Sequence, residues 1–100
     1  MRERLDRFVT EWKKMAIEFY TARNWEARPE FEVTDGKRYW KIIMKDGNSR
    51  SVRAFVDKTT GDILKPASWA APAKHARGSI LAEDFGMSCL EGPYGPKYLK

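Results

Sequence analysis

The chain has 100 residues and a net charge of +5, because 19 lysines and arginines stand against 14 aspartates and glutamates. Its length predicts a single domain, and no run of 18 apolar residues exists that would predict a membrane span. One cysteine and one histidine exclude an intramolecular disulfide and a zinc site built from these residue types. We therefore expect a cytoplasmic protein whose positive charge favours an anionic partner.

Residues 2–22 are predicted to form one amphipathic helix. Apolar residues recur at positions i, i+3, i+4 and i+7 over four turns, and charged residues fall on the opposite face. Because the apolar stripe is wide and aromatic, we expect the helix to lie flat on a sheet, with Asn24 near its end. The stripe consists of Leu5, Phe8, Val9, Trp12, Met15, Ala16, Phe19 and Tyr20.

An alternation of period two follows the helix and predicts four strands, at residues 31–33, 38–45, 50–57 and 62–65. Turn signals at 34–37, 46–49 and 58–61 separate them, so the strands should form an antiparallel meander. The alternation places Val52, Ala54 and Val56 on one face. The predicted fold is α+β, with a helical segment at 1–24, the four-stranded meander at 28–65 and an irregular segment at 66–100.

Prolines and glycines punctuate the irregular segment. "PAKHA" is expected to make a helical turn that begins at Pro72, and "SILAEDF" (79–85) a short helix that Ser79 caps and Gly86 stops. The tail "EGPYGPKYLK" predicts an extended arm whose possible docking points are Tyr94, Tyr98 and Leu99.

Most catalytic patterns are absent from the sequence. It has neither the phosphate-binding GxxxxGK[ST] nor GxGxxG. A dyad of Cys89 and His75 is formally possible, but "GMSCLEG" gives the thiol no basic neighbour that would activate it. We therefore predict a non-catalytic protein with no cofactor and no metal.

A stretch without acidic residues, from Ile63 to Ala82, is the first candidate site. The amides of Gly78 and Ser79 would open a short helix and bind an anion, with Arg77 and Lys74 as charged contacts and Trp69 stacking on a base. In the structural alternative, Trp69 packs against the core and the charged side chains are solvated. The candidate ligand-binding residues are Lys65, Ser68, Trp69, Lys74, His75, Arg77, Gly78 and Ser79.

The second candidate is one face of the predicted meander, on which basic and aromatic residues alternate. Such a face is typical of proteins that bind single-stranded nucleic acid. An ordinary half-exposed sheet face is the structural alternative. The residues of this face are Tyr39, Lys41, Lys45, Arg53 and Phe55.

The strings "KPASW" and "AKHARG" and the tail "GPYGPKYL" resemble a family of small uncharacterised proteins of tailed bacteriophages. The resemblance covers roughly residues 50–100. The positions that it marks as distinctive are Lys65, Ser68, Trp69, Lys74, His75, Arg77 and Gly78. The sequence departs from it at Ala70, where a lysine is expected. A phage origin implies a protein in the cytoplasm of an infected bacterium that acts by binding.

Three functions remain open. The first is sequestration of a small phosphorylated nucleotide, a signal in host immunity, by a homodimer or higher homo-oligomer. The second is a nucleic-acid-binding module that uses the basic sheet face. The third is a virion or host-protein interaction protein that docks through the tail. None of the three involves a membrane.

Overall fold

The computed structural model describes residues 1–24, 29–46, 48–90 and 95. One helix, α1 (Arg2–Ala22), precedes five strands and a short 3₁₀ helix (Met87–Cys89). The strands are β1 (Glu30–Asp35), β2 (Tyr39–Asp46), β3 (Ser49–Asp57), β4 (Asp62–Pro66) and β5 (Pro72–Ser79).

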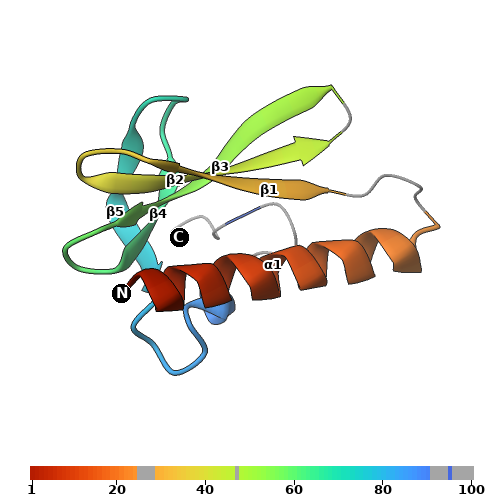
Figure 1. The fold of residues 1–100 in the computed structure, drawn as a ribbon, viewed down its shortest axis with the longest axis horizontal. Coiled ribbons are helices and arrows are strands. Elements are labelled where there is room, and N and C mark those ends of the chain that lie inside the picture. Colours follow the sequence, from red (N-terminus) through yellow and green to blue (C-terminus); the bar gives the residue numbers. More distant parts are fainter. Residues whose placement is uncertain (25–28, 47, 91–94, 96–100) are drawn as a thin grey trace.

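Helix α1 covers one face of the sheet, as its apolar spacing predicts (Figure 1). Its buried residues recur every three or four positions, so they share one side of the helix. Trp12 is fully buried, and its ring centroid lies 5.2 Å from that of Phe31 on β1. Asn24 adopts a left-handed φ of 56° just beyond the helix, a conformation common at helix ends. The buried side chains of the helix are Leu5, Phe8, Trp12, Ala16 and Tyr20.

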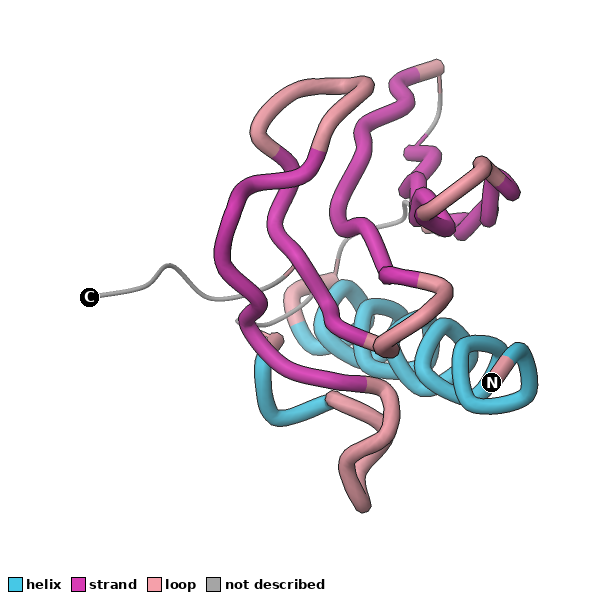
Figure 2. Tube along the Cα trace, turned by 90° about the vertical axis from the view of Figure 1, so that its left-hand side faces the viewer, coloured by secondary structure: helices cyan, strands magenta, loops and turns pink. Residues whose placement is uncertain are grey.

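The strands form an antiparallel sheet in the order β1-β2-β3-β4-β5, and Figure 2 shows neighbouring strands side by side. The α+β class and the helix on an antiparallel sheet are confirmed, but the number of four strands is wrong. The fifth strand, β5, lies where we expected an irregular segment with a helical turn at "PAKHA". It forms because Pro72 to Ser79 pair with β4, and this pairing outweighs the low strand propensity of Ala, Lys and Gly.

A β-bulge changes which side chains of β3 face the helix. Ile42 pairs with Ala54, whereas the next residue, Ile43, pairs with Val52, so that Arg53 is the extra residue on β3. Because paired residues share a face, Val52 lies with Ile43 on the side away from α1. The expectation that Val52 shares a face with Ala54 is therefore wrong.

The segment after β5 passes under the first turns of α1 (Figure 1). Arg4 of the helix donates hydrogen bonds to the carbonyl oxygens of Ile80 and Ala82, and its guanidinium carbon lies 4.5 Å from the centroid of the Phe85 ring. Residues 80–86 form turns, so the helix that we expected at 79–85 is absent. The Ser79 hydroxyl instead accepts a hydrogen bond from the amide of Leu81 at 3.1 Å.

No helix within the described ranges has the length and apolar character that a membrane crossing requires. The expected docking residues of the tail, Tyr94, Tyr98 and Leu99, lie outside the described residues.

Candidate nucleic-acid interface

The eight residues of the acid-free candidate do not gather into one pocket. Lys74 to Ser79 belong to the extended strand β5, which advances about 3.3 Å per residue, so Lys74 and Ser79 lie roughly 16 Å apart. Lys65 lies on β4, and Ser68 and Trp69 lie in the β4–β5 hairpin. His75 and Lys74 are exposed. This spread does not suit a single small anion.

Gly78 and Ser79 do not open a helix, so the expected anion site at a helix N-terminus is wrong. Gly78 pairs with Ile63 near one end of the β4–β5 ladder. A Cβ atom at Gly78 would lie 2.8 Å from the Cβ of Cys89, which is buried. Glycine therefore stands here because the 3₁₀ helix packs closely against the strand.

Trp69 connects the acid-free candidate with the basic sheet face. Its side chain is 47% exposed, so it does not pack into the core as the structural alternative supposed. The ammonium nitrogen of Lys41 lies 4.8 Å from the centroid of the indole ring, and the guanidinium carbon of Arg50 lies 5.8 Å from it. These distances are typical of cation–π contacts. The hairpin thus places Trp69 against cations of β2 and β3.

Six side chains from four parts of the chain, three cations and three aromatic rings, form a row of contacts. We call it the cation–aromatic ladder, and its order is Arg38, Tyr39, Phe55, Lys41, Trp69 and Arg50. The guanidinium carbon of Arg38 lies 5.2 Å from the Tyr39 ring, whose centroid is 6.0 Å from that of Phe55. The Lys41 ammonium lies 5.8 Å from the Phe55 ring, and the two contacts of Trp69 complete the row.

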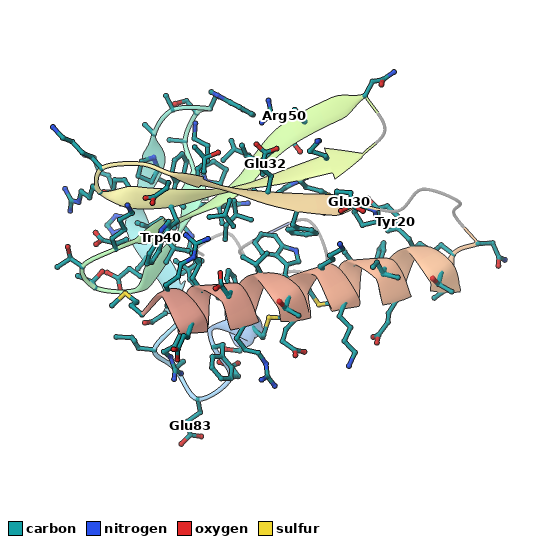
Figure 3. The ribbon with its side chains drawn as sticks, viewed as in Figure 1. Tyr20, Glu30, Glu32, Trp40, Arg50 and Glu83 are labelled. Atoms are coloured by element: carbon teal, nitrogen blue, oxygen red, sulfur yellow. The ribbon has the colours of Figure 1, made fainter. Side chains whose placement is uncertain are left out.

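The ladder lies on the face of the sheet that points away from α1. Lys41 pairs with Phe55 across β2 and β3, so the two side chains share this face, whereas Trp40 and Ile42 belong to the core under the sheet. In Figure 3, Arg50 points away from the helix and Trp40 toward it. Phe55 is only 3% exposed and forms the floor of the ladder.

The structure brings together three of the five predicted residues of the sheet face, namely Tyr39, Lys41 and Phe55. Lys45 is exposed farther along β2 and outside the ladder, and Arg53 is half-buried at the bulge with its Nε atom buried. Sequence reasoning missed Arg38 and Arg50. The pairing of Lys45 with Arg50 around the 46–49 turn is the signal that could have revealed the second of them.

Carboxylates neutralise part of this face. Arg50 pairs with Glu32 at 3.0 Å, Arg38 with Asp57 at 3.4 Å, and Lys58 with Asp35. Three further lysines lie near the ladder, namely Lys37, Lys41 and Lys45. Within the described residues, none of them forms an ion pair with a carboxylate. The face therefore keeps an excess of positive charge that attracts anions.

Asp57 fixes one end of the ladder. Burial raises the pKa of this carboxyl, but hydrogen bonds from the amides of Thr59 and Thr60 and from the Arg38 guanidinium more than offset burial, so the pKa lies below its ordinary value. Asp57 stays ionised at neutral pH and holds Arg38 beside Tyr39. Its place at the turn is the conformational role that aspartate commonly has.

A small pocket opens beside the Tyr39 end of the ladder. It has a volume of about 260 Å³ and lies between the β1–β2 turn and the β4–β5 hairpin. Its walls include three cations, two aromatic rings and a hydroxyl, which are groups that suit a phosphate and part of a nucleoside. The lining residues are Thr34, Gly36, Lys37, Arg38, Tyr39, Lys41, Phe55 and Ala70.

In the part of the chain that the structure describes, no three histidine, cysteine, aspartate or glutamate side chains gather in a way that could hold a metal ion. Residues 3–94 match a family model described as "Family of unknown function (DUF7717)". The match spans 92 of 100 residues, since 94 − 3 + 1 = 92, and the chain therefore belongs to this family. No curated protein and no solved structure matches the chain.

Proposed function

We propose that this family member is a non-catalytic protein that binds single-stranded nucleic acid on the face of its sheet opposite α1. One observation carries the proposal: the half-exposed indole of Trp69 lies within cation–π distance of Lys41 and Arg50. An exposed aromatic ring beside cations provides both contacts that a single strand needs. The ring stacks on a base, and the cations bind the flanking phosphates.

The shape of the site favours a single strand over a duplex. The aromatic groups of the ladder lie on a sheet face and not on a helix that could enter a major groove. The bases of a duplex are stacked on each other, so Trp69 could reach none of their faces without unstacking them. A single strand offers its bases at little cost, and stacking tolerates any sequence because every base has a π-face.

Trp69→Ala is expected to weaken the binding of a fluorescein-labelled ten-nucleotide oligothymidylate by about 5- to 160-fold, since stacking on one aromatic side chain contributes about 1–3 kcal/mol. Trp69→Phe should restore much of the affinity. Fluorescence anisotropy at a fixed salt concentration measures both. Leu81→Ala is the matched control, because Leu81 is 52% exposed but lies in the loop under α1. Equal losses from Trp69→Ala and Leu81→Ala would contradict the proposal.

The affinity should also fall with rising salt, because phosphate contacts release counterions. Lys41→Gln is expected to reduce the slope of log K against log salt by about 0.7, the value for one contact to a single strand. Lys14→Gln removes the same charge from the exposed side of α1 and should leave the slope unchanged. A slope near zero for the unaltered protein would rule out a phosphate-binding face.

The resemblance to phage proteins suggests a biological setting in which the chain would act inside an infected bacterium. Sequestration of a small phosphorylated nucleotide by a homo-oligomer remains a prediction, and it would use the same aromatic and cationic groups. Docking to a virion or host protein through the tail also remains a prediction. Co-purification of the native protein with a nucleic acid, a nucleotide or a host protein would select one of the three.

A further inference from the structure

The pocket beside Tyr39 differs from the rest of the ladder in its density of charge. Lys37, Arg38 and Lys41 all line a space of about 260 Å³. The carboxylate that contacts this group of cations is Asp57, which is buried and binds Arg38 and the turn amides. Three cations against one carboxylate leave two positive charges at the pocket.

Two positive charges exceed what a phosphate within a strand requires. An internal phosphodiester carries one negative charge, whereas a phosphomonoester carries about 1.5 to 2 at neutral pH and has three acceptor oxygens. In a nucleic acid a phosphomonoester occurs only at the end of a strand, and among free nucleotides a nucleoside monophosphate carries one. The charge of the pocket therefore matches a terminal phosphate better than an internal one.

The remaining walls suit the nucleoside that carries such a phosphate. Tyr39 and Phe55 contribute an aromatic side, with their ring centroids 6.0 Å apart and the rings nearly perpendicular. Thr34 contributes a hydroxyl, and Ala70 closes the pocket from the hairpin that also carries Trp69. The pocket is smaller than sites that enclose a whole ligand, which measure about 300–1,000 Å³. It holds the phosphate and leaves the base to the exposed Trp69 ring of the ladder.

We infer that this pocket binds the terminal phosphomonoester of a nucleotide, either at the end of a single strand or in a free nucleoside monophosphate. The inference rests on the proposed function of the ladder and names the part of the ligand that the pocket selects. Arg38 provides a planar guanidinium for the phosphate oxygens, while Lys37 and Lys41 provide point charges.

The test compares ten-nucleotide oligothymidylates with a 5′-phosphate, a 3′-phosphate or hydroxyl groups at both ends, with thymidine 5′-monophosphate as the free nucleotide. We expect one phosphorylated end to bind about five- to tenfold more tightly than the hydroxyl-ended strand, because it gains charge-assisted hydrogen bonds. Isothermal titration calorimetry measures the binding of each of the four probes directly. Lys37→Gln should abolish most of this preference, and Lys14→Gln, with the same change in net charge, should preserve it.

The possible outcomes test the inference about the pocket and the proposed function of the ladder separately. If the strands bind without any preference for a phosphorylated end, the inference is wrong and the proposed function stands. An equal loss of preference in Lys37→Gln and Lys14→Gln would also overturn the inference. If the monophosphate binds in a Lys37-dependent manner and no strand does, the pocket is supported and strand binding is overturned. If no probe binds, both proposals fail.

Discussion

Replacing Gly86 with alanine is expected to lower the free energy of unfolding by about 2–5 kcal/mol, through backbone strain and overpacking together. Gly86 has a backbone φ of 89°, which residues with a side chain rarely adopt. A Cβ atom there would also lie 2.9 Å from the carbonyl oxygen of Ser79 and would overlap the fully buried side chain of Ile63. Since the carbonyl belongs to the backbone, it cannot move aside as a side chain would. Urea unfolding followed by circular dichroism measures the loss.

Gly61→Ala distinguishes the cost of backbone strain from the cost of overpacking. Gly61 has a similar φ of 80°, but an added Cβ would meet only side-chain atoms, at 3.1 Å or more. We expect it to cost about 1–2 kcal/mol, mainly from the backbone. If the two substitutions cost the same, the close approach of the 80–86 loop to β4 and β5 contributes nothing. A loss below about 1 kcal/mol for Gly86→Ala would contradict the close packing of this loop against Ile63 of β4 and Ser79 of β5.

The helix and the first four strands could be predicted because their hydrophobic periods are regular. The apolar spacing from Leu5 to Tyr20 reproduces the buried side of α1, and the turn signals separate β1 to β4 correctly. Strand β5 could not be predicted, because "PAKHARGS" has neither alternation nor β-branched residues. It forms a strand because it pairs with the edge of β4, and the residues of β5 alone do not predict this tertiary contact.

The sequence predicts the candidate site as two separate halves, and no pattern in it indicates that they meet. Tyr39, Lys41 and Phe55 follow from the alternation, while Trp69 was assigned to a separate anion site. Their meeting depends on the path of the β4–β5 hairpin, which brings residue 69 against residue 41. The bulge at Arg53 could not be predicted either, because no residue pattern in β3 indicates where an extra residue shifts the alternation.

Replacing Asp57 with alanine is expected to lower the free energy of unfolding by about 2–4 kcal/mol at pH 7. Its buried carboxylate accepts hydrogen bonds from the amides of Thr59 and Thr60, at 2.8 and 3.2 Å, and pairs with Arg38. Hydrogen bonds to a charged group contribute about 1.5–3 kcal/mol, and the two amides would lose their acceptor. Chemical unfolding at several pH values measures the loss and its dependence on protonation.

The pH dependence of this loss follows from the lowered pKa of Asp57. A carboxyl whose folded pKa lies below its ordinary value of 3.8 stabilises the fold fully above that value and loses the contribution as pH falls through the folded pKa. The difference in stability between the unaltered protein and Asp57→Asn should therefore be constant from pH 7 to about 5 and shrink below pH 4. Asp6→Asn, which removes an exposed pair with Arg2, should change stability by less than about 1 kcal/mol throughout.

Asp57 also links the stability of the turn to the proposed pocket, because the same carboxylate that accepts the turn amides positions Arg38 beside Tyr39. At neutral pH, Asp57→Asn should keep an acceptor for the amides but release the guanidinium. We expect the preference for a phosphorylated strand end to fall even where the protein remains folded, despite the positive charge that the substitution adds to the pocket. Measuring that preference at a temperature well below the unfolding midpoint separates positioning from stability. An unchanged preference in a folded Asp57→Asn variant would show that Arg38 does not need the carboxylate to reach the ligand.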